Sequence, residues 1–256
     1  MWLRVIKPLI LSLVLFIILQ ATTLCLVGRY HFSFNWLLAI AFFVLLLSIV
    51  ITYQSCAKDK ICKKQTKFIV FAIPPIFLFW GLAGFLFFNT NFYMREIFLI
   101  LSTLAYFIIF SEIFSEFTHH VHDLVKFLVI FLLFDSILEL VHYFRLPLYF
   151  IPLLILACAF ILMHHMFWRL SALKRNYSFT GLGVGAILGI FAWIAAYYWP
   201  LASYFVLAIM VMSLYYVAWG ILHHHIEHRL TKAIALDYIF IGAFVFLMAL
   251  GLIFLS

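Results

Sequence analysis

The sequence predicts an all-α polytopic integral membrane protein, a bundle of about nine transmembrane helices with the N-terminus inside and the C-terminus outside. Three observations predict this fold class: 68% of the 256 residues are apolar, 10% are charged, and the mean hydropathy is +1.22. So little polar surface could not cover a soluble fold. The apolar runs are continuous and do not alternate with polar residues, which favours helices over barrel strands.

Each predicted span has about 20 residues, the length that crosses a hydrocarbon layer about 30 Å thick. In chain order the spans cover residues 5–27, 34–55, 67–88, 96–118, 124–144, 147–168, 179–199, 201–222 and 235–255. The first apolar run is longer than that of a signal peptide, so we expect it to be retained as a span. All loops are short, which predicts one transmembrane domain over 1–256. An alternative is a two-helix addition (1–56) before a seven-helix core (67–256).

The basic residues predict the orientation. With a cytoplasmic N-terminus, 13 of the 16 Lys and Arg residues lie inside, and only Arg29, Arg95 and Arg145 lie outside. The net charge of +7 therefore indicates topology and contact with anionic lipid headgroups, and we expect no nucleic-acid partner. The expected location is the inner or plasma membrane.

Small residues recur along the seventh span. Gly181, Gly185 and Gly189 are spaced four apart, so they share one face of a helix. Such a stripe is typical of two membrane helices whose backbones approach closely. We therefore expect this face to pack against a neighbouring helix.

Ionisable residues lie inside two of the spans. Glu112 belongs to the fourth span, and Asp135, Glu139 and His142 follow at i, i+4 and i+7 of the fifth, on one helix face. Because the two spans join near residue 123, Glu112 and Asp135 should lie at similar depth. Such groups are costly in lipid and often mark ion pathways. This ladder predicts, as an alternative function, transport of protons or a divalent cation.

Nine of the eleven histidines gather at the predicted inner ends of three spans. Imidazole and carboxylate groups are the usual ligands of zinc and iron, so we expect a divalent metal there, with zinc favoured over iron. His224 and His228, one helical turn apart, form the best ligand pair. The full set of candidate ligands is His119, His120, His164, His165, His224 and His228.

This arrangement resembles the superfamily of alkaline ceramidases and progestin/adipoQ receptors (CREST). Ser115 and His119 end one span, Asp123 begins the next, and His224 with His228 lead into the last. In that family a Ser-x-x-x-His, an Asp and a His-x-x-x-His occupy such positions in a seven-helix core. The resemblance implies that three histidines hold zinc, which activates water to cut an amide bond in a lipid.

The leading hypothesis is therefore a metal-dependent hydrolase that acts on a membrane lipid or another lipophilic substrate at the cytoplasmic face. Ser115, Glu116 and Asp123 are the candidate catalytic residues, with Asp123 or Glu116 as the general base. Beside the transporter, a non-catalytic membrane assembly subunit is a further alternative. The surplus histidines also allow a di-iron membrane oxygenase or desaturase.

Overall fold

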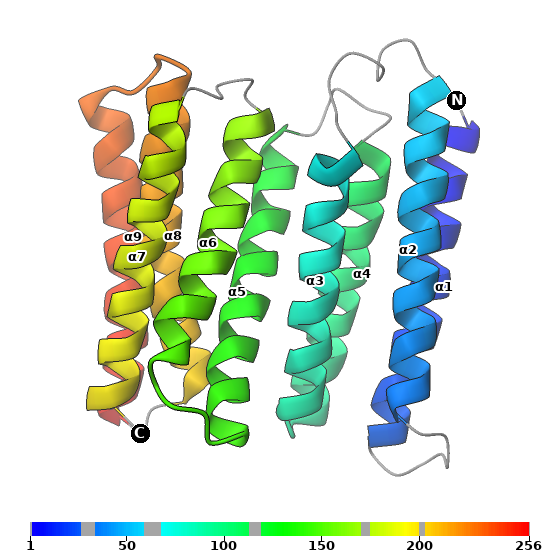
Figure 1. The fold of residues 1–256 in the computed structure, drawn as a ribbon, viewed down its shortest axis with the longest axis horizontal. Coiled ribbons are helices and arrows are strands. Elements are labelled where there is room, and N and C mark those ends of the chain that lie inside the picture. The colour runs from blue at the N-terminus through cyan, green and yellow to red at the C-terminus, as the bar shows by residue number, and fades with distance from the viewer. Residues whose placement is uncertain are drawn as a thin grey trace. The chain divides into compact units, whose positions relative to one another are not determined.

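The computed structural model describes residues 2–26, 34–58, 68–112, 119–169, 175–199 and 203–255. Within these ranges the chain forms nine α-helices and no strand, which confirms the predicted fold class (Figure 1). The helices are α1 (Trp2–Leu26), α2 (Phe34–Lys58), α3 (Phe68–Phe88), α4 (Phe92–Glu112), α5 (His119–Tyr143), α6 (Phe150–Arg169), α7 (Arg175–Tyr198), α8 (Tyr204–Ile226) and α9 (Lys232–Leu255).

Seven of these helices, α1 to α4 and α7 to α9, are long and apolar enough to cross a membrane. In α6 the apolar stretch is shorter, Phe150–His165. Helix α5 carries Lys126, Asp135 and Glu139 within its length, so it is less apolar than its neighbours. The membrane-spanning character predicted from composition is thus present in the helices themselves.

Several helix boundaries differ by three or more residues from the predicted ones. Helix α4 begins at Phe92, four residues before the predicted start, because the side chain of Asn91 accepts a hydrogen bond from the backbone N–H of Met94 at 3.3 Å. His119 belongs to α5, and not to the end of the preceding span as predicted, and Asp123 lies in α5 as well. The polar run around these two residues has no apolar periodicity, so the sequence pattern could not place the boundary.

The chain divides into two compact units, Met1–Val129 (unit 1) and Ile130–Ser256 (unit 2). The division falls inside α5, so it separates two packing units and not two halves joined by a linker. The prediction of a single transmembrane domain stays a prediction.

In unit 1, α1 packs against α2 and α4, and α3 packs against the same two helices. The four helices therefore close a ring around one core, in which Leu45, Phe79 and Tyr106 are fully buried. Several buried hydroxyls of this unit donate to carbonyl oxygens of their own helices, for example Thr22 Oγ1 to Leu19 and Thr52 Oγ1 to Ser48. Such bonds satisfy polar side chains where no water reaches them.

In unit 2, the glycine stripe of α7 faces α6, as predicted. A Cβ on Gly185 would lie 2.9 Å from the carbonyl oxygen of Leu156, and one on Gly189 would lie 2.6 Å from that of Pro152. Backbone atoms cannot move aside as a flexible side chain can, so only glycine permits this approach. Helix α8 packs against both α7 and α9.

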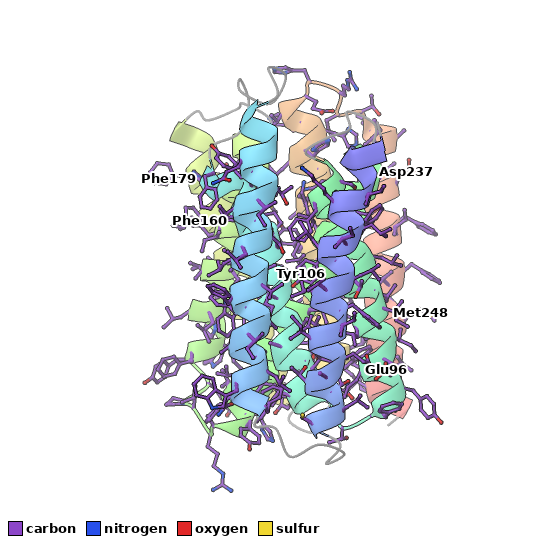
Figure 2. All side chains as sticks on the ribbon, turned by 90° about the vertical axis from the view of Figure 1, so that its right-hand side faces the viewer. Glu96, Tyr106, Phe160, Phe179, Asp237 and Met248 are labelled. Atoms are coloured by element: carbon purple, nitrogen blue, oxygen red, sulfur yellow. The ribbon has the colours of Figure 1, made fainter. Side chains whose placement is uncertain are left out.

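Large apolar side chains also point outward on most helices. Figure 2 shows two of them, Phe179 of α7 and Met248 of α9, projecting away from the ribbon, and both are exposed. On α9 most of the large apolar residues are exposed, including Leu236, Phe240 and Phe254. A soluble protein would not expose such apolar surfaces to water, so we expect these side chains to contact lipid.

Candidate functional site

The predicted line of ionisable groups on α5 is present in unit 2. Asp135, Glu139 and His142 share one face of the helix, and about 10 Å of helix axis separates the first from the last. Asp135 is only 4% exposed, Glu139 is half-buried, and His142 is exposed. Asp135 and Glu139 interact electrostatically, as do Glu139 and His142. The line therefore runs from a buried carboxyl to an accessible imidazole.

Tyr204, the first residue of α8, joins this line. Its phenol oxygen lies 2.9 Å from Nδ1 of His142, and the two ring centroids are 5.1 Å apart. Tyr204 also interacts electrostatically with Glu139. We call Asp135, Glu139, His142 and Tyr204 the acid–histidine line. It connects two helices through residues that are 62 positions apart in the sequence.

Sequence reasoning missed Tyr204 because an aromatic residue at the end of a span is typical of the membrane interface. A signal was nevertheless available. The predicted topology places the end of the fifth span and the start of the eighth on the same side of the membrane, which implies a similar depth for His142 and Tyr204. Comparing depths across spans would have suggested the pair.

A second histidine–tyrosine pair lies at the other end of α8. Nε2 of His224 is 3.3 Å from the phenol oxygen of Tyr238 on α9. Gly220 makes room for it, since the ring of Tyr238 occupies the place where a Cβ would lie. His223 lies beside it, stacked on Trp219 with ring centroids 5.0 Å apart, and its Nε2 is 3.5 Å from Oε1 of Glu227.

His228 does not continue the helix that carries His224. Helix α8 ends at Ile226, and the backbone φ of His228 is 56°. The N–H of His228 bonds to the carbonyl of His225, and the N–H of Arg229 bonds to that of His224, which is a Schellman C-cap. The helical i, i+4 geometry expected for His224 and His228 is therefore not kept. Their role as metal ligands stays a prediction.

The histidines of α6 lie in different surroundings. His165 is buried, and the half-buried ring of His164 stacks on Phe160 with centroids 5.7 Å apart. Among the residues that the structure describes, no three His, Cys, Asp or Glu side chains are grouped so that they could hold a metal ion. The four described candidates, His164, His165, His224 and His228, thus do not form a metal centre by themselves.

The side chains of the other predicted site residues lie outside the described part of the structure. Ser115 and Glu116 fall in 113–118, outside the described residues. Glu112, His119, His120 and Asp123 lie at helix ends whose side chains are also outside the description. The predicted ligands and catalytic groups from this part of the chain therefore stay predictions.

Comparison with known protein families, with curated proteins and with solved structures gives no match for this chain. The resemblance to the CREST superfamily thus stays a prediction from a few residues.

Proposed function

We propose that the protein moves protons across the membrane through unit 2, along the acid–histidine line. The observation that supports this most is the hydrogen bond between His142 and Tyr204. It links the carboxyl groups of α5 to a second helix at the exposed end of the line. Ionisable side chains inside membrane helices are costly, and proton relays built from Asp, Glu and His are a known reason for their presence.

In this proposal Asp135, Glu139 and His142 each take up and release one proton, and Tyr204 orients the ring of His142. In the proposed neutral state, Nδ1 of His142 accepts a hydrogen bond from the Tyr204 hydroxyl, and the ring proton of His142 lies on Nε2. When His142 takes up a second proton, Nδ1 becomes a donor and the phenol oxygen accepts. His142 then passes a proton to Glu139, Glu139 passes it to the buried Asp135, and Asp135 releases it towards the opposite side of the membrane. No electron is transferred at any step.

The test is proton flux into liposomes that contain the purified protein and a pH-sensitive dye. A potassium gradient with valinomycin supplies the driving potential. We expect wild-type protein to carry protons and Asp135→Asn to reduce the flux to that of empty liposomes. Asp237→Asn is the matched control, because this exposed carboxyl on α9 lies outside the line. Flux through Asp135→Asn at the wild-type rate would refute the proposal.

A metal-dependent hydrolase is the second candidate, and one observation favours it. Nδ1 of His224 is buried and has no hydrogen-bond partner among the described residues. An imidazole nitrogen in that state offers a lone pair to a metal ion. The test is the metal content of detergent-purified wild type beside His224→Ala, with exposed His225→Ala as control. Equal metal content in all three proteins would eliminate His224 as a ligand.

A further inference from the structure

Arg95, in the first turn of α4, is a buried cation without an ion pair in the described part of unit 1. Only 7% of it is exposed, and it shares the core-facing side of α4 with the buried residues Leu99, Ser102 and Tyr106. Its guanidinium makes no ion pair with a described residue, and its Nε is buried without a hydrogen-bond partner among them. A buried charge left unpaired is strongly unfavourable.

Helices α1 to α4 carry only two acidic residues, Glu96 and Glu112, and neither pairs with this arginine. Glu96, labelled in Figure 2, follows Arg95 in the sequence, but both of its carboxyl oxygens accept hydrogen bonds from Nε2 of Gln20 on α1, at 2.9 and 3.0 Å. Glu112 lies about 25 Å further along the axis of α4. Residues 27–33, between α1 and α2 in the sequence, include no Asp or Glu. The counterion of Arg95 is therefore not a carboxyl group of these helices.

The place of Arg95 on α4 favours an anion as the missing partner. The first turn of a helix carries a partial positive charge, which repels a cation and attracts an anion. No acidic residue of α4 lies in that turn to compensate it. A negative ion beside Arg95 would thus be stabilised by the guanidinium and by the helix dipole together. Because Arg95 lies at the end of the helix, such an ion can reach it without crossing the bilayer.

Ser102 is a second buried donor without a partner on the same side of α4. Its hydroxyl is fully buried and makes no hydrogen bond with a described residue. The neighbouring hydroxyl of Thr103 behaves differently, since it donates to the carbonyl oxygen of Leu99 at 2.8 Å. About 10 Å of helix axis separates Ser102 from Arg95. The core-facing side of α4 therefore presents two unpartnered hydrogen-bond donors, a guanidinium and a hydroxyl.

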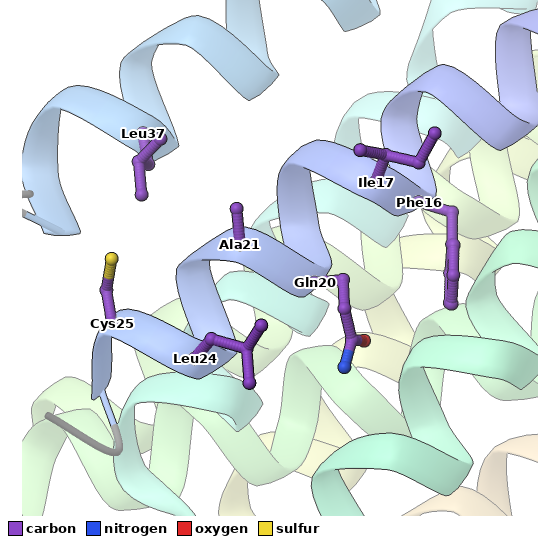
Figure 3. A pocket seen from close by; sticks show the side chains of 7 residues that line it. All are labelled: Phe16, Ile17, Gln20, Ala21, Leu24, Cys25 and Leu37. Carbon is purple, nitrogen blue, oxygen red and sulfur yellow. The ribbon is translucent and has the colours of Figure 1, made fainter. Parts of the chain in front are cut away.

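The cavity of about 450 Å³ in unit 1 is a separate feature (Figure 3). Its lining residues belong to α1 and, at Leu37, to α2, and none of them is charged. Such a lining does not compensate the desolvation of an anion. We therefore assign the cavity no part in the site at Arg95.

We propose that Arg95 binds a chloride ion on the core-facing side of α4, with the hydroxyl of Ser102 as a second donor. Chloride carries the single negative charge that balances one guanidinium, and both donor groups form hydrogen bonds to anions. A divalent anion such as sulfate would leave one negative charge uncompensated among apolar side chains, at a high desolvation cost. The site lies wholly in unit 1 and is independent of the proposed proton transport.

The experiment measures chloride binding to the purified protein in detergent by isothermal titration calorimetry, with sodium gluconate as the background salt. We expect Arg95→Gln to bind chloride at least roughly tenfold more weakly than wild type, because the charge-assisted hydrogen bonds are lost. Exposed Arg145→Gln is the matched control and should bind as wild type does. Ser102→Ala should weaken binding roughly threefold to tenfold. Thr103→Val should not, because the Thr103 hydroxyl is bonded within its own helix.

Thermal unfolding at constant ionic strength separates loss of the site from loss of the fold. In gluconate, Arg95→Gln should unfold at the same or a higher temperature than wild type, because it lacks an unpaired buried charge. Replacing gluconate with chloride should raise the unfolding temperature of wild type and not that of Arg95→Gln. Arg95→Lys keeps the charge and should keep part of this stabilisation.

Three results would overturn the proposal. They are no binding of chloride to wild type, binding to Arg95→Gln as tight as to wild type, and stabilisation of wild type by sulfate equal to that by chloride. Chloride binding to Ser102→Ala as tight as to wild type would remove the Ser102 hydroxyl from the site.

Discussion

The phenol oxygen of Tyr204 lies 2.9 Å from Nδ1 of His142, so the first residue of α8 is bonded to the last turn of α5. The bond lies at the exposed end of the acid–histidine line. Because Tyr204 belongs to α8, residues of two helices hold the imidazole ring of His142 in its orientation.

Tyr204→Phe removes this bond and leaves the ring in place. We expect proton flux in liposomes to fall roughly threefold to tenfold, because a neutral hydrogen bond contributes about 0.5–1.5 kcal/mol. Tyr149→Phe, an exposed tyrosine in the connection between α5 and α6, is the matched control and should leave the flux unchanged. Equal flux in both variants would show that Tyr204 plays no part in transport.

Gly189→Ala should destabilise the protein by about 1–3 kcal/mol, because the added Cβ meets the backbone oxygen of Pro152, which cannot yield without moving α6. Gly183→Ala is the control on the same helix, since nothing lies within 4 Å of its Cβ. It should be neutral or stabilising by up to about 1 kcal/mol. Thermal unfolding in detergent measures both, and a Gly189→Ala protein as stable as Gly183→Ala would contradict this packing.

His228→Gly should stabilise the protein by about 1 kcal/mol, because a residue with a side chain is strained at φ 56° and glycine is not. His228→Val should destabilise it, since a β-branched residue tolerates this conformation least. Thermal unfolding gives the stability, and elemental analysis of the same samples tests the ligand role. If His228 holds a metal, His228→Gly should instead lose both the metal and stability, so the change in stability would be a loss and not a gain.

Arg145→Gly provides an independent check on that reasoning. Arg145 has φ 50°, and the N–H of Leu146 bonds to the carbonyl of Val141. The end of α5 thus has the same type of C-cap as the end of α8. No metal is proposed near Arg145, so a gain of about 1 kcal/mol is expected from backbone strain alone. A loss of stability in thermal unfolding would indicate that the arginine side chain matters more than its backbone.

Much of the fold could be predicted from the sequence, because hydrophobic runs of fixed length are the main requirement for crossing a bilayer. The glycine stripe of α7 also identified its packing face, since close backbone approach requires small residues at regular spacing. The same reasoning placed Asp135, Glu139 and His142 on one face from helical periodicity alone.

The candidate site was harder to predict because it depends on contacts between helices. Tyr204 could be found only by pairing depths across two distant spans. His228 was expected to follow His224 on one helix, but the C-cap at Glu227 ends that helix. Neither histidine nor arginine is a usual residue at a left-handed cap, so the sequence carried no stop signal there.

The most direct test of the central claim, that protons move along the acid–histidine line, is the rate of proton flux in liposomes for wild type, Asp135→Asn and Asp135→Glu. The account predicts that the glutamate variant keeps measurable flux, because it retains a titratable carboxyl, and that the asparagine variant has none. Equal flux in the asparagine variant and wild type would contradict it.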